Sequence, residues 1–223
     1  MQLMIGFVLG SILMFLTFML FSFFHYHAKW SIKYSIANMF PFELNYRGTF
    51  GENFFGNISY ILSLIATGAA YFLVGFNTTD GIKITIMIFG FLQIVVMFFI
   101  LFVSTEHLKV HLLCDALFFV FEFVVPALFF VGAFRDMQNS TFHPLQIAIY
   151  VMSGVALLAT SILILNPRLT TSLKMETKTN EKGEEIKTRP RFIVLALSEW
   201  ILMFIHYLNL ITAYLFILLG YVK

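Results

Sequence analysis

The chain has 223 residues, of which 60% are hydrophobic and 12% charged, and its formal net charge is +2. Soluble domains carry about 25% charged residues, so this composition argues against a soluble domain and indicates a polytopic membrane protein. The small net charge and the lack of interleaved basic and aromatic residues argue against a nucleic-acid partner. The single cysteine, Cys114, excludes an intrachain disulfide bond and a cysteine-rich zinc site.

Six stretches are long and apolar enough to cross a bilayer, which takes about 20 residues each. Because a chain of this length with spans this long cannot form a barrel, we expect every span to be a helix. The expected fold is therefore all-α, a six-helix transmembrane bundle that forms one domain over residues 1–223. The expected spans are about 2–24, 57–77, 83–104, 110–134, 145–166 and 192–220.

The first span lacks a charged start and a small-residue cleavage site, so we interpret it as a retained span and not as a signal peptide. The connection 25–56 mixes aromatic and cationic residues, a composition typical of the headgroup region. We expect it to lie along the interface and to be partly helical from Ala28 to Met39. Pro41 and Gly48 would end any helix there.

The second span has a face of small residues at helical spacing, which lets helices approach closely; it consists of Ser59, Ser63, Thr67 and Ala70. We interpret this face as a packing surface. The loops after the second and fourth spans are short, so the spans that they join should be antiparallel neighbours. Pro126 should kink the fourth span and free a backbone carbonyl, which then needs a partner.

The one sizeable hydrophilic connection is 167–191. Alternation over 173–179, a turn at Asn180 to Gly183 and a second alternating run over 185–189 predict a short β-hairpin. A disordered loop of mixed charge is an equal alternative.

The loops after spans one, three and five carry eleven basic residues, and the opposite side carries three. The positive-inside rule then predicts that both termini face outward. Two potential glycosylation sites, at Asn77 and Asn139, would be exposed on that outer side.

The fourth span carries ionisable residues on one face. His107, His111, Asp115 and Glu122 follow at steps of four, four and seven, which places them within about 80° on a helix. A carboxylate at the centre of a spanning helix costs about 2.5 to 3.5 kcal/mol, so it indicates a functional site. The histidine pair with Asp115 is typical of a zinc or iron site or of proton handling. The alternatives are interfacial histidines, an Asp115 bonded to a neighbouring helix and a Glu122 held neutral by burial.

The last span carries Glu199 and His206 seven residues apart, with Asn209 beside them. Carboxylates and imidazoles from the fourth and sixth spans could converge as a general acid, a general base or a metal site. A polar lock between helices is the alternative. The candidate site residues are His111, Asp115, Glu199 and His206. The sequence indicates no particular cofactor and leaves the identity of any metal open.

Three stretches carry a resemblance to a known family: PFELNYRGTFGENFFGN after the first span, STEHLKVHLLCDALFFVF entering the fourth and ALSEWILMFIHYLNLITAYLF in the sixth. They resemble the six-span eukaryotic family that groups the GPI-anchor lipid-remodelling protein, the damage-regulated autophagy modulators (DRAM) and the yeast Sfk-type proteins. His111 and Glu199-Trp200 match the family pattern, and Gly48 and Glu52 match its first loop loosely.

This chain departs from the family in that loop, where Asn45-Tyr46-Arg47 replaces a Ser-Asp pair and Gly51 replaces a proline. The resemblance implies residence in the endoplasmic reticulum, Golgi, endolysosomal or plasma membrane. It also implies cytosolic termini, contrary to the charge count above.

The leading hypothesis is a membrane protein that acts on lipids or lipid-anchored proteins, by acyl transfer or hydrolysis or as an accessory to that step, as in GPI-anchor remodelling. His111 and Glu199 would be acid/base or metal partners, oriented by Asp115 and His206. The alternative is a non-enzymatic scaffold or regulator of other membrane proteins. A transporter would need a continuous polar path, which the first span does not offer. The expected partners are membrane lipids and, for a scaffold, other membrane proteins.

Overall fold

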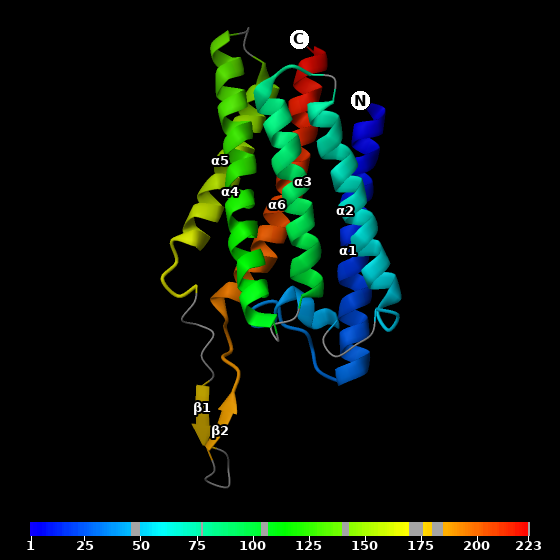
Figure 1. Cartoon of the computed structure of the whole chain (residues 1–223), viewed down its shortest axis with the longest axis vertical. Helices are drawn as coiled ribbons and strands as arrows, with labels where there is room; N and C mark the ends of the chain where they lie inside the picture. Colours follow the sequence, from blue (N-terminus) through cyan, green and yellow to red (C-terminus); the bar gives the residue numbers. More distant parts are fainter. Residues whose placement is uncertain are drawn as a thin grey trace.

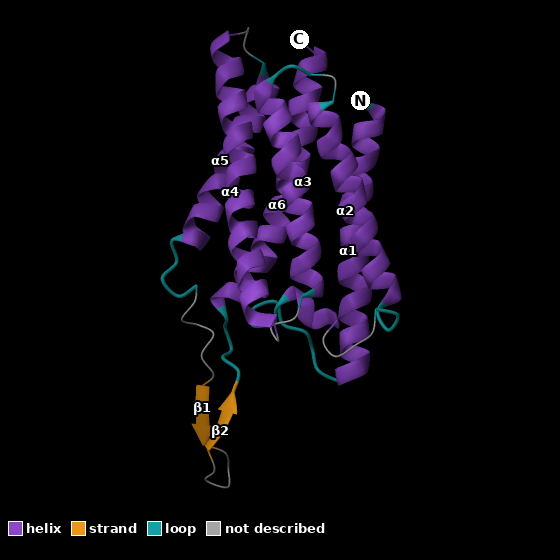
Figure 2. Cartoon of the chain, viewed as in Figure 1, coloured by secondary structure: helices purple, strands orange, loops and turns teal. Residues whose placement is uncertain are grey.

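The structure, a computed structural model, describes residues 1–45, 50–76, 78–103, 107–139, 143–169, 176–179 and 185–222. Within these ranges it is a bundle of six long helices (Figure 1, Figure 2). The helices are α1 (Gln2–Trp30), α2 (Phe54–Gly75), α3 (Gly81–Phe102), α4 (Leu108–Asn139), α5 (Pro144–Ile164) and α6 (Val194–Val222). All six are long and apolar enough to cross a membrane. The protein is therefore an integral multi-pass membrane protein, and the expected six-helix bundle is confirmed.

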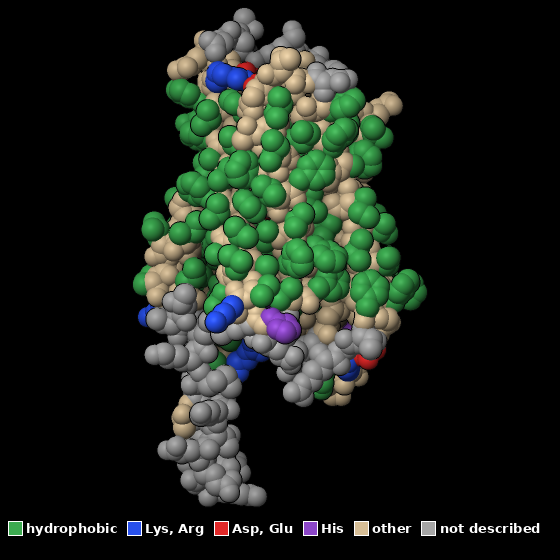
Figure 3. All heavy atoms as spheres, in the orientation of Figure 1, with side chains coloured by type: hydrophobic (Ala, Val, Ile, Leu, Met, Phe, Trp, Pro, Cys, Tyr) green, Lys and Arg blue, Asp and Glu red, His purple; other side chains and the backbone are tan. Residues whose placement is uncertain are grey.

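Both termini lie at one end of the bundle, as an even number of spans requires, and the strands β1 (Glu176–Thr179) and β2 (Glu185–Thr188) project beyond the other end (Figure 1). We call these the terminal end and the strand end. Figure 3 shows hydrophobic side chains across the middle of one face, with charged and histidine side chains near the two ends. This belt is the surface that contacts the membrane lipids. Which end faces the cytosol stays a prediction.

α1 extends further than the expected span, to Trp30, and it ends where Ser31 adopts a left-handed conformation at φ 53°. Of the stretch from Ala28 to Met39, which was expected to be partly helical, the first three residues belong to α1 and the rest does not form a helix. The chain turns there instead, with the Met39 N–H bonded to the Ser35 carbonyl at 2.9 Å and the Tyr34 hydroxyl donating to the Phe40 carbonyl at 2.7 Å. A short 3-10 helix, η1 (Pro41–Asn45), follows. Pro41 takes its first position, where a backbone N–H is not needed; Gly48 lies outside the described residues.

The small-residue face of α2 packs against α1, as predicted. Ser11 Oγ lies 2.6 Å from Thr67 Oγ1, and Ser63 Oγ donates to the Ser11 carbonyl at 2.8 Å. α2 and α3 also approach closely, because a Cβ at Gly90 would lie 2.4 Å from Cγ of the Tyr71 ring. Only a residue without a side chain fits there.

Pro126 lies inside α4, where it cannot donate to the carbonyl of Glu122 four residues earlier. The freed carbonyl accepts a bond from the Thr160 hydroxyl of α5 at 3.4 Å. The expected partner for that carbonyl is therefore present, and it comes from a neighbouring helix.

At the terminal end, Asp80 caps α3 by accepting from the Ile82 N–H at 3.0 Å. Its carboxylate also accepts two bonds from Arg135, at 3.1 and 2.6 Å. These bonds hold the pKa of Asp80 below its usual range. The helix start and an inter-helix ion pair thus share one carboxylate.

β1 and β2 pair antiparallel, with Glu176 opposite Thr188 and Thr179 opposite Glu185. The predicted turn at 180–183 lies outside the described residues, so the hairpin as a whole stays a prediction. Asn77 and residues 140–141 of the second potential glycosylation site also lie outside them.

Candidate functional site

Three of the four candidate residues converge at the strand end of the bundle. His111 and Asp115 lie one turn apart on α4, and Glu199 reaches them from α6. His111 Nε2 lies 3.5 Å from Glu199 Oε1 and 3.7 Å from Asp115 Oδ2. The three side chains are buried, with exposed fractions of 1%, 3% and 0% for His111, Asp115 and Glu199. We call this group the His111 cluster.

The His111 cluster lies close to the ends of its helices. His111 is three residues from the first residue of α4, and Glu199 is five residues from the first residue of α6. At 1.5 Å per residue, this places their Cα atoms about 5 to 8 Å inside the helix ends. The cluster thus lies near the strand end of the bundle.

The hydrogen bonds of His111 define its tautomer. Its Nδ1 lies 2.9 Å from the carbonyl of Val103, and a carbonyl can only accept, so Nδ1 carries a proton. In the neutral ring, Nε2 then presents a lone pair to the two carboxylates. Among the described residues, neither Nε2 nor any carboxylate oxygen of Asp115 and Glu199 has a hydrogen-bond partner. The three residues offer ligand atoms that all lie within 4.8 Å of one another, so they could hold a metal ion.

A segment that the sequence did not identify closes the cluster from the strand end. Residues 31–45, which we call the cap, place the rings of Phe40 and Phe42 with their centres 5.8 and 5.1 Å from the His111 ring. The Trp200 indole, next to Glu199, donates to the carbonyl of Met39 at 3.0 Å. The cap therefore seals the cluster with aromatic rings.

The cap is also attached to the segment between β2 and α6. Arg189 donates two bonds of 2.6 Å to the carboxylate of Glu43, and the Ile193 N–H donates to the Ala37 carbonyl at 2.9 Å. Burial, reinforced by the negative charge of Glu43, raises the pKa of Tyr34 well above its usual value, so its hydroxyl stays a donor to the cap backbone. These contacts join segments about 150 residues apart.

The fourth candidate residue, His206, belongs to a different group. Its Nδ1 lies 3.1 Å from Glu122 Oε1, and Asn209 Nδ2 donates to Glu122 Oε2 at 2.9 Å. All three side chains are fully buried. His206 follows Glu199 by seven residues, or about 10 Å along the helix axis, so it lies deeper in the membrane than the His111 cluster. We call Glu122, His206 and Asn209 the Glu122 cluster.

His107 does not join the cluster. It is exposed and lies in the turn directly before α4, which begins at Leu108, and this agrees with the alternative of an interfacial histidine. Glu199 takes the place that the sequence assigned to His107.

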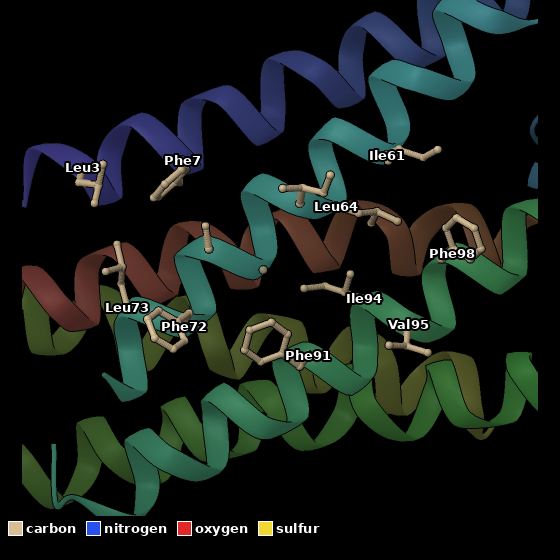
Figure 4. A pocket seen from close by; sticks show the side chains of 13 residues that line it. Leu3, Phe7, Ile61, Leu64, Phe72, Leu73, Phe91, Ile94, Val95 and Phe98 are labelled. Atoms are coloured by element: carbon tan, nitrogen blue, oxygen red, sulfur yellow. The ribbon is translucent and has the colours of Figure 1, made fainter. Parts of the chain in front are cut away.

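A groove of about 750 Å³ lies elsewhere on the bundle, between α1, α2 and α3 (Figure 4). Its walls are entirely apolar side chains, including Phe7, Leu64 and Phe91. No residue of either cluster lines it, so it does not lead to the candidate site.

The fold and the site define a six-span integral membrane protein with a buried histidine–carboxylate centre near the strand end of the bundle. Comparison of the chain with protein-family models, curated proteins and solved structures found no match. The resemblance to the lipid-remodelling family therefore stays a prediction.

Proposed function

We propose that this protein acts on membrane lipids or lipid-anchored proteins by transferring or hydrolysing an acyl group at the His111 cluster, in the manner of GPI-anchor remodelling. The observation that carries the proposal is the convergence, inside the bundle, of one imidazole and two carboxylates from two helices, α4 and α6. Buried ionisable groups inside membrane spans are costly, and this cost is typical of functional sites.

Acyl transfer needs groups that move protons. The attacking water or lipid hydroxyl loses a proton as its oxygen bonds to the acyl carbonyl carbon, and the departing alcohol oxygen gains one as the old ester bond breaks. When the His111 ring is neutral and both carboxyl groups are ionised, the cluster offers only acceptor atoms toward its centre, so it can accept the proton of the first transfer and return it in the second.

The depth of the cluster supports a lipid substrate. A lipid ester near the strand end would lie at the same level as Glu199, whereas a soluble substrate would have to enter past the cap. Because the cap covers His111 with Phe40 and Phe42, substrate entry requires the cap to move.

The cellular location follows from the same proposal. A lipid-anchor remodelling protein works in the endoplasmic reticulum or Golgi, and the wider family that the sequence resembles also occupies endolysosomal and plasma membranes. We propose an endomembrane or plasma-membrane location on the basis of this resemblance.

The test is lipid-anchor processing in cells that depend on this chain. His111→Ala and Glu199→Gln, introduced separately, should abolish the change in acyl composition of GPI anchors, read by mass spectrometry. His107→Ala is the matched control, because this histidine is exposed and lies outside the cluster. Normal processing in both cluster variants, with normal protein levels, would refute the proposal.

A second candidate function is a non-enzymatic scaffold or regulator of other membrane proteins. The observation that favours it is that the His111 cluster is enclosed. No residue of the cluster lines the apolar groove, and the ring of Phe42 packs against His111. In that case Glu199→Gln lowers stability without a specific biochemical defect, and wild-type protein shows no acyl release from labelled lipids in reconstituted vesicles.

A further inference from the structure

We propose that His111, Asp115 and Glu199 form a binding site for a divalent transition-metal ion, with zinc as the ion that fits best. The proposal concerns metal binding itself, and it does not depend on the lipid chemistry proposed above. It rests on four features of the site: its spacing, the His111 tautomer, the unpaired buried oxygens and the local charge.

The spacing of the ligand atoms is close to that of a metal site. Zinc bonds of about 2.0 to 2.1 Å at tetrahedral angles place two ligand atoms about 3.3 to 3.4 Å apart. His111 Nε2 lies 3.5 Å from one carboxylate oxygen and 3.7 Å from the other. All three ligand atoms lie within 4.8 Å of one another, so small side-chain rotations complete the geometry.

The tautomer of His111 favours a cation over direct hydrogen bonding. Metal-bound histidines usually donate their other ring N–H to a carbonyl or a carboxylate, which orients the ring. Nδ1 of His111 makes this bond with the Val103 carbonyl at 2.9 Å. Nε2 is too far from both carboxylates for a hydrogen bond, which needs about 2.7 to 3.2 Å. The lone pair thus points at two other acceptors, an arrangement that a cation between them would stabilise.

The two carboxyl groups lack a nitrogen donor within hydrogen-bond distance, because within the described ranges their polar contacts are only with His111 Nε2, at 3.5 and 3.7 Å, and with each other. All four of their oxygens are buried and have no hydrogen-bond partner among the described residues. Buried charges in proteins are normally paired or bound to metals. A bound ion would satisfy both residues at once.

The local charge also favours a dication. The charge of Glu43 acts on Glu199 in addition to that of Asp115. Arg189, a basic residue that contacts the cap, directs both of its defined side-chain bonds to Glu43 and none to the cluster. Ionised Asp115 and Glu199 would therefore leave two negative charges, which a divalent ion neutralises.

The ligand set narrows the identity of the ion. One imidazole and two carboxylates suit zinc and other first-row dications better than soft, thiolate-binding ions. Three protein ligands leave a fourth tetrahedral position for water or substrate, as in catalytic zinc sites. The rings of Phe40 and Phe42 beside His111 would keep bulk water from that position.

The test uses the full chain purified into lipid nanodiscs, equilibrated with zinc chloride, separated from free zinc and analysed by elemental mass spectrometry. We expect about one zinc ion per chain. His111→Ala, Asp115→Asn and Glu199→Gln should each lower bound zinc at least tenfold. His107→Ala and Glu122→Gln are matched controls, one exposed histidine and one buried carboxylate outside the site, and both should retain the zinc.

A second measurement separates lost binding from lost folding. Zinc should raise the melting temperature of the wild-type protein and leave that of Glu199→Gln unchanged, while both proteins keep the same helical content. No zinc in the wild-type protein, or equal zinc in the wild-type protein and all three site variants, would overturn the proposal. A proton shared between Asp115 and Glu199 would then explain the cluster.

The two proposals fail separately. Zinc bound at the expected ratio without any acyl transfer would retain the metal site and refute the lipid function. If instead the wild-type protein never binds zinc but transfers acyl groups, and Glu199→Gln abolishes that transfer, the lipid function is retained and the metal site is refuted.

Discussion

The His111 cluster and the Glu122 cluster contain the same kinds of side chain on the same two helices, yet they differ in how their atoms are satisfied. In the Glu122 cluster, each carboxylate oxygen is hydrogen-bonded to a nitrogen, from His206 or Asn209, although His206 Nε2 and Asn209 Oδ1 have no partner in the described part of the chain. In the His111 cluster, no carboxylate oxygen has a hydrogen-bond partner among the described residues. A buried carboxylate whose oxygens are bonded stabilises the fold, whereas one whose oxygens are left unbonded is costly and needs another explanation. We infer that the deeper cluster holds helices together and that the shallower one binds something.

The largest expected effect comes from removing the acceptor of the Glu122 cluster. Glu122→Leu leaves His206 and Asn209 buried without their partner, at about 1 to 3 kcal/mol for each group. We expect a loss of about 2 to 5 kcal/mol in the free energy of unfolding, measured by denaturation in a fixed lipid nanodisc. Glu122→Gln, which keeps an oxygen for Asn209, should lose less than half as much. Equal stability of wild type and Glu122→Leu would remove the contrast between the clusters.

The next effect concerns the cap, which covers only the His111 cluster. Arg189→Ala leaves the largely buried Glu43 carboxylate without its two charge-assisted bonds. Because Arg189 is about one-third exposed, we expect a local loss of about 1 to 2 kcal/mol. Hydrogen exchange over residues 35–45 should accelerate accordingly. Arg191→Ala is the matched control, since this neighbouring arginine is exposed; equal acceleration in both variants would show that the ion pair does not hold the cap.

A smaller effect should have the opposite sign. In protein treated with a chelator, Glu199→Leu removes one of two unpaired, adjacent carboxylates. Replacing buried charged groups by apolar ones is often neutral or stabilising, so we expect a gain of up to about 1 kcal/mol in the free energy of unfolding. The denaturation measurement that shows a lower free energy of unfolding for Glu122→Leu should therefore show no decrease for Glu199→Leu. A loss of similar size in both variants would mean that the two clusters have the same structural role.

The smallest effect lies outside both clusters and serves as a reference. Arg135 lowers the pKa of Asp80, so this pair contributes stability that is complete above the unfolded-state value of about 3.9 and is lost as pH falls through the lower folded-state pKa. Because both side chains are partly exposed, we expect about 0.5 kcal/mol. Asp80→Asn should remove this acid dependence from the unfolding curve. An unchanged pH profile in that variant would assign the dependence to another group.

The bundle was predictable because a run of about 20 apolar residues is a local property that defines a membrane helix. The pairing of His111 with Asp115 was predictable for the same reason, since both lie on one helix. His107 was placed on the same face, but it is exposed and lies outside the cluster. Helical spacing gave the separation of about 10 Å between Glu199 and His206 along α6, but not that the two residues belong to different clusters.

No pattern in the sequence predicted the cap as clearly as the apolar runs predicted the helices. Glu43 lies in the short 3-10 helix η1 among aromatic residues, and its partner Arg189 lies 146 residues away in the sequence. No helical or strand periodicity relates two residues that lie so far apart in the sequence. The single local clue was Pro41, which indicated where a helix would end but not which part of the bundle the segment would cover.

The position of α6 after the other five helices in the chain has a consequence for biosynthesis. Asp115 and Glu122 enter the membrane on α4, before Glu199, His206 and Asn209 have been synthesised. During that interval α4 presents two carboxyl groups whose final neighbours do not yet exist, so the translocation machinery or a chaperone has to shield them. Assembly therefore finishes only when the sixth crossing docks, and chains that stop short of it are natural targets for membrane quality control.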